Sequence, residues 1–392
     1  MLIYEEPALV SNLVNDIDFA IGLGAIRELL ERNGIEPSEV GQLHRIKDVR
    51  LYQGLTKDGD GEAQVHDMAS VVLSPKWADG PEWPVIQPGP AFKLPPPKSK
   101  STKPIRDGFQ TAVVAPDMQI GFYYDKSDQL VPTHDPVAID LFLGITKQLN
   151  PDLVVMVGDN LDLPEMGKYR TYPAFARTSQ ASIDYTTELM FRIRAAAPEA
   201  RIVWLAGNHE ERLANYLLDN STAAFGLRQG SAPDAWPVLS VPFLCRLDEM
   251  GVEFLEGYPA NDFWINERLR VIHGDRVKTN GSTAHKYLAE HKTSVIYGHV
   301  HRREWAEKTF KKWDGAKTIM AASPGCLAKV DGAVPSTKGS VDLHGRPLTV
   351  VEDWQQGIGV VSYQTEGDHR FFYEQIPFHD GQALFRGKIY GS

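Results

Sequence analysis

Short apolar runs that each end in a polar side chain constrain the fold of this chain more than any other feature of its sequence. The clearest example is Leu153-Val154-Val155-Met156-Val157, which is followed by Gly158-Asp159. A run of this length without a polar residue indicates a strand that is buried on both faces. Asp159 would then lie at the carboxyl end of that strand, where open α/β sheets bind their ligands.

Four further apolar runs end in side chains that can bind metal. The predicted strands cover residues 111–115, 201–205, 269–272 and 294–297, and the side chains that follow them are Asp117 and Gln119, Asn208 and His209, His273, and His299 and His301. With these strands side by side, their carboxyl ends meet at one edge of a sheet. Carboxylate, amide and imidazole groups suit Mn, Zn or Fe. The sequence therefore predicts a metal site at that edge.

The stretches between these runs have the apolar spacing of helices. We expect helices over residues 136–149, 179–196, 211–218 and 283–291, and further strands over 318–321, 359–364 and 369–376. Strands that alternate with helices are typical of an α/β domain. This pattern predicts one such domain over residues 107–392.

The sequence of residues 1–73 predicts a small helical N-terminal module. Residues 17–33 carry apolar side chains at helical spacing before Gly34, and a second helix is expected from Pro37 through Val49. Two short helices around a turn are also found in DNA-binding proteins. Six Lys/Arg against thirteen Asp/Glu in this region favour a docking module over a DNA-binding one.

Residues 74–106 have the composition of a linker. Nine prolines fall between Pro75 and Pro104, and three lysines lie between Lys98 and Lys103. Such a segment is expected to be extended and semi-rigid.

The overall charge limits how the chain can meet nucleic acid. A net charge of -10 argues against binding through bulk charge, although a local basic groove remains open. The basic and aromatic residues near the predicted site are Lys308, Lys311, Lys312 and Trp313. They fit either a contact to a substrate or a solvated face of a helix or hairpin.

Cysteine content and hydropathy indicate a cytoplasmic protein without a membrane partner. Cys245 and Cys326 are the only cysteines, so no disulfide framework is expected. No apolar run approaches the roughly 18 residues that a membrane span needs. The first residues lack the basic start and apolar block of a signal peptide.

The order of the polar motifs resembles the calcineurin-like metallophosphoesterase superfamily. That family shows Asp-x-His, Gly-Asp, Gly-Asn-His-Asp/Glu, a lone His and Gly-His-x-His; the matching segments here are Asp117-Met118-Gln119, Gly158-Asp159, Gly207-Asn208-His209-Glu210, His273 and Gly298-His299-Val300-His301. The resemblance covers about residues 110–330, and the stretch 117–169 resembles members encoded by bacteriophages. It implies a four-layer α-β-β-α sandwich with a dinuclear metal site at the sheet edge.

The resemblance also implies a role for each of these residues. Two divalent metal ions, most simply Mn, with Zn, Fe or Mg as alternatives, would bind there. Asp117, Asp159 and His301 would hold the first ion, and Asp159, Asn208, His273 and His299 the second. His209 would protonate the leaving oxygen, with Asp162 to orient it. Gln119 stands in place of a family histidine, and it either binds metal through its neutral carbonyl, which favours Mn or Mg over Zn, or hydrogen-bonds to the loop.

These features predict a phosphoester hydrolase that uses a metal-bridging hydroxide as its nucleophile. Leu163 stands where protein Ser/Thr phosphatases of the superfamily carry a phosphate-binding arginine, which argues against protein substrates. Ser323-Pro324-Gly325-Cys326 resembles a turn found in small phosphodiesterases of the family. We therefore expect a phosphodiesterase that acts on a nucleotide or a nucleic acid.

Other readings of the sequence remain open. A DNA exonuclease or endonuclease of the same superfamily and a phosphomonoesterase would use the same ligands. One non-enzymatic alternative is a binding or scaffold protein with a degenerate site, for which Gln119 is the only support. Another is a helix-turn-helix DNA-binding regulator that is built on the N-terminal helices and has a degenerate catalytic core. A protein or DNA partner could bind the N-terminal module.

Overall fold

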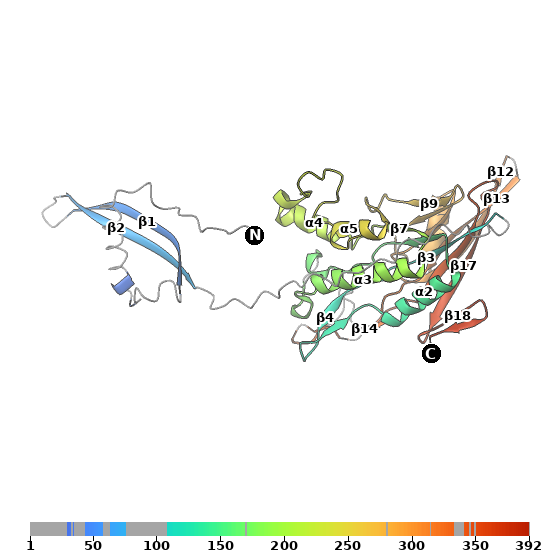
Figure 1. The fold of residues 1–392 in the computed structure, drawn as a ribbon, viewed down its shortest axis with the longest axis horizontal. Helices are drawn as coiled ribbons and strands as arrows, with labels where there is room; N and C mark the ends of the chain where they lie inside the picture. Colours follow the sequence, from blue (N-terminus) through green and yellow to red (C-terminus); the bar gives the residue numbers. More distant parts are fainter. Residues whose placement is uncertain are drawn as a thin grey trace. The chain divides into compact units, whose positions relative to one another are not determined.

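A computed structural model divides the chain into two compact units, Met1–Ala91 and Phe92–Ser392, and each is described by itself (Figure 1). The division falls within the predicted linker. The structure describes residues 30–32, 34, 44–57, 63–75, 108–168, 171–279, 281–313, 315–332, 341–344, 346–348 and 350–391; for 44–57, 63–75, 332 and 350 it describes the backbone.

The described part of the first unit is mainly a pair of antiparallel strands. β1 (His44–Lys57) pairs with β2 (Ala63–Pro75), with His44 opposite Pro75 and Lys57 opposite Ala63. The helix predicted through Val49 is therefore wrong for residues 44–49, and β2 runs two residues into the predicted linker. Asp58-Gly59 lies between the strands in the sequence, and Asp-Gly is a strong hairpin signal that outweighs the helical spacing of Ile46 and Val49.

The other N-terminal predictions lie largely outside the described residues. Of the predicted helix over 17–33, the structure describes residues 30–32, which are helical. The rest of that helix, and the linker beyond Pro75, lie outside the described part of the chain.

The second unit contains two main sheets. The larger has the strand order β19-β18-β17-β16-β3-β6-β7-β8, and the smaller has the order β12-β13-β11-β10-β9. In the first sheet β3, β6, β7 and β8 are parallel, and in the second β10, β11 and β13 are parallel. The bounds in the larger sheet are β3 Gln110–Ala115, β6 Leu153–Met156, β7 Arg201–Leu205, β8 Val252–Leu255, β16 Gly357–Tyr363, β17 Phe371–His379, β18 Gln382–Phe385 and β19 Lys388–Tyr390.

The smaller sheet and two short hairpins complete the strands of this unit. Those of the smaller sheet are β9 Phe263–Asn266, β10 Leu269–Ile272, β11 Ser294–Tyr297, β12 Arg303–Lys312 and β13 Gly315–Pro324. The short pairs are β4 Phe122–Tyr124 with β5 Leu130–Pro132, and β14 Asp331–Gly332 with β15 Val350–Val351. Residues 308–313, which the sequence assigned to a helix or a hairpin, thus lie on the β12–β13 hairpin.

Helices lie on the outer faces of the two sheets. α2 (Pro136–Leu149) and α3 (Ser179–Ala196) pack against each other beside the larger sheet (Figure 1). The remaining helical segments are α4 Glu211–Asn220, α5 Val241–Leu244, α6 Thr283–Glu290 and the short turns η2 Pro164–Met166, η3 Pro173–Phe175, η4 Thr222–Ala224 and η5 Asp248–Met250. None of the described helices is both long and apolar enough to cross a bilayer.

Local sequence explains where α2 begins and ends. The Asp135 carboxylate accepts hydrogen bonds from the N–H groups of Val137 and Ala138, and Pro136 occupies the first turn, where its missing N–H costs nothing. Asn150 adopts the left-handed conformation with φ 48°, which ends the helix. The bounds of α2 therefore agree with the predicted range 136–149.

Alternate residues of the central strands point into different layers. Val113 and Val154 belong to the apolar cluster that includes Phe142 of α2. Val114 and Val155 belong to a second cluster, which joins the larger sheet to Val271 and Ile296 of the smaller one. Because successive side chains of a strand alternate in direction, each strand serves two cores, which explains its uninterrupted apolar run.

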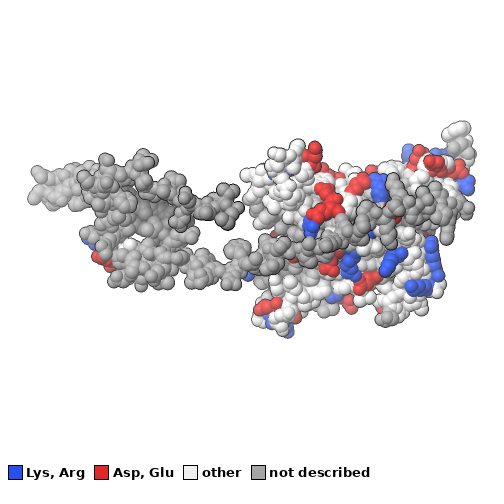
Figure 2. All heavy atoms as spheres, viewed as in Figure 1, with Lys and Arg blue, Asp and Glu red and all other residues white. Residues whose placement is uncertain are grey.

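A third apolar cluster completes the layering. It packs Tyr287 and Leu288 of α6 against Val295 and Tyr297 of β11. The order is therefore helices, sheet, sheet and helix, and the predicted four-layer α-β-β-α sandwich is confirmed. Figure 2 shows acidic and basic side chains interspersed over the visible face of this unit rather than a field of one sign.

Candidate metal centre

The predicted site residues come together at the carboxyl ends of parallel strands from both sheets. β3, β6 and β7 lead to Asp117, Asp159 and Asn208, and β10 and β11 lead to His273 and His299. The loops after β3 and β6 stay paired, because Gln119 N donates to Asp159 O at 2.9 Å and Ile120 N donates to Asn160 O at 2.9 Å. The structure thus brings Asp117 and His299, which are 182 positions apart, into one site.

Asp159, His273 and His299 form the tightest group of possible ligands. One ligand atom from each lies within 4.8 Å of the others. Asp159 Oδ2 is 3.4 Å from His273 Nε2 and 3.6 Å from His209 Nε2. Such a spacing of carboxylate and imidazole atoms suits a divalent cation.

Asp117, Gln119 and His301 form a second polar group beside the first. Asp117 Oδ1 is 3.2 Å from His301 Nε2, and Gln119 Nε2 is 3.1 Å from the same His301 atom. His299 joins the two groups, because its backbone N–H donates to Asp117 Oδ1 at 2.9 Å while its side chain belongs to the first group. The second polar group therefore lies next to the possible metal site formed by Asp159, His273 and His299.

The tautomer of His273 shows that its outer nitrogen is available to a cation. Its Nδ1 lies 2.8 Å from Val157 O, and a carbonyl can only accept, so Nδ1 carries a proton. Its Nε2 faces Asp159 Oδ2 at 3.4 Å and Asn208 Oδ1 at 3.2 Å. Two acceptor oxygens and an imidazole nitrogen that meet in this way are satisfied together by a proton or a metal ion.

The pKa values at the site show the same demand for positive charge. Burial lowers the pKa of His273, but Asp159, Asp117 and Glu210 outweigh it and raise that pKa to about 10. Burial and then repulsion from His273 lower the pKa of His299 to about 4. Burial opposes ionisation of Asp159, but His209 and His273 hold its pKa well below the ordinary value. The site is thus built around a carboxylate that remains charged.

The backbone is strained where the predicted ligands lie. Gln119, Asp159, His299 and His301 have positive φ angles of 47°, 51°, 68° and 56°. L-residues rarely adopt this region, and such conformations concentrate at functional sites. Gly298 is required here as well, because a Cβ at this position would lie 2.6 Å from Asp117 Oδ2.

The residues present fit a metal centre by one further test. Gln119 Oε1 and His301 Nδ1 are buried without a hydrogen-bond partner among the described residues. Buried polar atoms are nearly always paired, so an unpaired carbonyl oxygen beside Asp117 and His301 indicates a missing ligand. This observation favours direct ligation by Gln119 over a hydrogen bond to its loop.

His209 is held by Asp162 and Arg212. His209 Nδ1 is 3.2 Å from Asp162 Oδ1, and Arg212 Nη2 is 2.8 Å from His209 Nε2. Arg212 also pairs directly with the buried Asp162 carboxylate. Burial raises the pKa of Asp162. Arg212 and His209 lower it by more than burial raises it, so the carboxyl stays ionised. Asp162 therefore lies against the His209 ring, and its role in orienting that ring stays a prediction.

The role of Glu210 was not predicted from the sequence. Its buried carboxylate accepts backbone hydrogen bonds from Asp159 N at 2.9 Å, Asn160 N at 2.8 Å, Leu161 N at 3.3 Å and Gly207 N at 2.7 Å. Burial and Asp159 raise its pKa against the effect of these bonds. Glu210 thus joins the loop after β6 to the loop after β7, and its place directly after His209 was the available signal.

Arg212, Trp354 and Gln355 were missed as well. The Trp354 ring meets the His301 ring edge-on at 4.2 Å, and Gln355 N donates to His301 O at 2.9 Å. Arg212 lies three residues after His209, one helical turn away, and this spacing could have indicated the contact. Trp354 carried no sequence signal, because the contact depends on tertiary packing.

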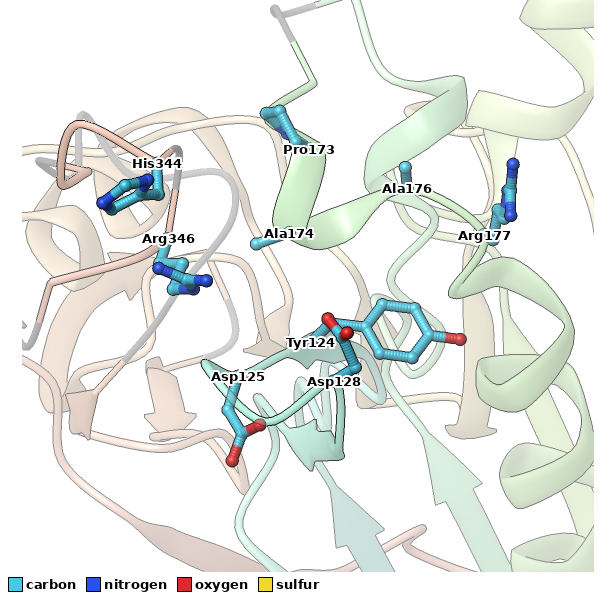
Figure 3. A pocket seen from close by; sticks show the side chains of 9 residues that line it. All are labelled: Tyr124, Asp125, Asp128, Pro173, Ala174, Ala176, Arg177, His344 and Arg346. Carbon is cyan, nitrogen blue, oxygen red and sulfur yellow. The ribbon is translucent and has the colours of Figure 1, made fainter.

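A cavity of about 560 Å³ borders the β4–β5 hairpin. Figure 3 shows Tyr124 and Asp128 near its centre, Arg346 and His344 on one side and Arg177 on the other. Among the residues that line it, none belongs to the predicted metal ligands. The cavity is therefore separate from the ligand set.

Comparison with known proteins agrees with this geometry. Residues 123–314 match the family of calcineurin-like phosphoesterases. The chain belongs to this family. The matched range contains Asp159, Asn208, His273 and His299, while Asp117 lies six residues before it. Its family and its possible metal site make this calcineurin-like chain a metal-dependent phosphoester hydrolase.

Two curated relatives come from bacteriophages. The chain is 23% identical over 274 residues to the Gene 54 protein of Mycobacterium phage L5, which covers 67% of this chain and 96% of the relative. It is 24% identical over 284 residues to the Gene 54 protein of Mycobacterium phage D29, with the same two shares. These similarities agree with the predicted resemblance to phage-encoded members.

Proposed function

We propose that this chain hydrolyses phosphodiesters at a centre of two divalent metal ions, with Mn as the preferred ion. The observation that carries the proposal is the meeting of His273 Nε2 with Asp159 Oδ2 and Asn208 Oδ1, at 3.4 and 3.2 Å. A proton on His273 or a metal ion would satisfy these three atoms, and the unpaired Gln119 Oε1 nearby supports the metal ion.

The ligand sets follow from the two polar groups. Asp117, His301 and the unpaired Gln119 Oε1 would hold one ion, and Asn208, His273 and His299 the other, with Asp159 between them. An amide oxygen is a harder ligand than the imidazole nitrogen that it replaces. The first position therefore favours a hard cation such as Mn or Mg over Zn.

When bound, two divalent ions supply charge neutralisation for the phosphate and lower the pKa of a water nucleophile. The residues of the chain supply the other half of the reaction. His209 would donate a proton from Nε2 to the leaving oxygen while Asp162 holds Nδ1 at 3.2 Å. Because Arg212 Nη2 now donates to that Nε2 at 2.8 Å, protonation of Nε2 requires Arg212 to give up this hydrogen bond.

The environment of Leu163 supports a diester as substrate. Its side chain is fully buried in the apolar core beneath the site, so this position offers no cation to a phosphate. A monoester carries more negative charge than a diester at neutral pH and depends more on such a cation. The proposed substrate is therefore a phosphodiester of a nucleotide or nucleic acid, and a partner for the N-terminal module stays a prediction.

The test compares hydrolysis of bis(p-nitrophenyl) phosphate and p-nitrophenyl phosphate by the full chain with Mn. We expect faster turnover of the diester, and a loss of at least about 100-fold in Asp159→Asn. Asp219→Asn, the same change at an exposed position of α4, is the control and should keep the full rate. Absence of turnover, or equal rates in Asp159→Asn and Asp219→Asn, would overturn the proposal.

His209→Gln separates proton donation from metal binding. The variant should keep its metal content, measured by mass spectrometry of the ions, and lose about 100-fold or more in rate. Loss of metal in this variant would show that His209 is a ligand instead.

A further inference from the structure

A second cavity lies at the end of the smaller sheet that is opposite the candidate metal centre. It measures about 540 Å³ and is lined by Arg268, Ser294, Lys312, Ala316, Lys317, Thr318, Arg370, Phe371 and Phe372. Arg268 directly precedes β10 and Ser294 begins β11, so the cavity lies at the amino ends of the strands whose carboxyl ends carry His273 and His299. A four-residue strand spans about 13 Å, which separates this cavity from the metal centre.

The lining of this cavity is positively charged. Four of its side chains are cationic, namely Arg268, Lys312, Lys317 and Arg370, and none of the lining residues is acidic. Arg370 pairs with Asp368, and Lys317 Nζ donates to Lys292 O at 3.2 Å. Arg268 and Lys312 have no ion-pair partner among the described residues. The charge of this lining is thus opposite in sign to the net charge of -10 of the whole chain.

The cations of the cavity repel one another. Burial, then Lys312 and Arg268, lower the pKa of Lys317 below its ordinary value. Such repulsion is relieved when an anion enters, and phosphate groups are the anions that clustered Lys and Arg side chains bind best.

An exposed aromatic ring lines the same cavity as these cations. Phe372 is 65% exposed and packs against Phe109 with 5.7 Å between ring centroids. Apolar rings at such exposure gain from stacking on flat partners, and unpaired nucleobases are flat partners that come joined to phosphates.

We propose that this cavity binds single-stranded nucleic acid, with Arg268 and Lys312 contacting phosphates and Phe372 stacking on a base. A duplex is disfavoured, because its bases are already stacked on each other. The inference does not rest on the proposed hydrolysis, since the cavity lies at the other edge of the sheet and its binding needs no metal.

The experiment measures fluorescence anisotropy of a labelled oligothymidylate with the full chain in EDTA, over a range of salt concentrations. In the double variant Arg268→Gln/Lys312→Gln we expect at least tenfold weaker binding. The slope of log affinity against log salt should fall by about 1.4, since each phosphate contact in a single strand contributes about 0.7. Phe372→Ala should weaken binding at least fivefold, as loss of one stacked base predicts, with an unchanged slope.

Lys311→Gln is the matched control. Lys311 neighbours Lys312 on β12 and is exposed, but it points to the opposite face of the strand and does not line the cavity. It should change affinity less than twofold. The proposal is overturned if the wild-type chain does not bind, if Lys311→Gln weakens binding as much as the double variant Arg268→Gln/Lys312→Gln, or if Phe372→Ala has no effect. It is also overturned if a duplex or thymidine monophosphate binds as tightly as the oligomer.

Discussion

Replacing Glu210 by glutamine tests how the loops of the metal centre are held together. Glu210 Oε2 accepts from the N–H groups of Asp159 and Gly207, and Oε1 accepts from those of Asn160 and Leu161. In Glu210→Gln one of these oxygens becomes an NH₂ group, which can only donate. In either orientation of the amide, two buried N–H groups lose their acceptor and face another donor.

The expected loss of stability follows from this count. A buried donor that loses its partner costs about 1–3 kcal/mol, so two of them cost about 2–6 kcal/mol. We expect the free energy of unfolding to fall by about 4 kcal/mol, a large part of the about 5–15 kcal/mol that domains possess. Urea titrations of the full chain in EDTA, followed by tryptophan fluorescence, measure this change without a contribution from bound metal.

The matched control is Glu211→Gln, the same change at the next residue. Glu211 is half-buried and has no hydrogen-bond partner among the described residues. It should change the free energy of unfolding by less than about 0.5 kcal/mol. A difference between the two variants of less than 1 kcal/mol would refute the assignment of Glu210 as the group that joins the two loops.

Three further perturbations follow from the structure. His134 is buried and its pKa is lowered to about 4, so the unfolded chain binds a proton first and stability should fall as pH drops from about 6.5 to 4. His134→Leu should remove about 2 kcal/mol of that acid dependence, measured by urea titrations at pH 7 and 4.5. Gly298→Ala puts a Cβ 2.6 Å from Asp117 Oδ2 and should lower the measured metal content, whereas Gly230→Ala, with open space around it, should not. Gln119→His should tighten Zn binding about tenfold, or ~1.4 kcal/mol, in a chelator competition, and unchanged Zn affinity would argue against a ligand at this position.

Much of the site was predictable because it depends on strand ends. Strands such as Leu153–Met156 are buried on both faces, and their apolar runs stop where the backbone leaves the sheet. Asp159, His273 and His299 follow such stops, so their convergence follows from parallel strands alone. Apolar side chains at helical spacing predicted α2 and α3, and the bounds of both helices agree with the predicted ranges.

The missed features depend on contacts between distant segments. Glu210 accepts from N–H groups 49–51 residues away, and no local pattern reports such a partner. Trp354 reaches His301 only through packing. In β1, the spacing of Ile46 and Val49 favours a helix, and the pairing with β2 overrides it.

The left-handed backbone at Gln119, Asp159, His299 and His301 has a consequence for how this chain can change under selection for heat resistance. Each such residue costs at least about 1 kcal/mol relative to glycine, so the four together store about 4 kcal/mol. Substituting glycine at these positions in the metal-free chain would raise its melting temperature and at the same time remove the proposed metal ligands. Thermostable variants selected without a requirement for activity should therefore lose their metal ligands among their first substitutions, and that order of loss would identify the ligands without any assay of catalysis.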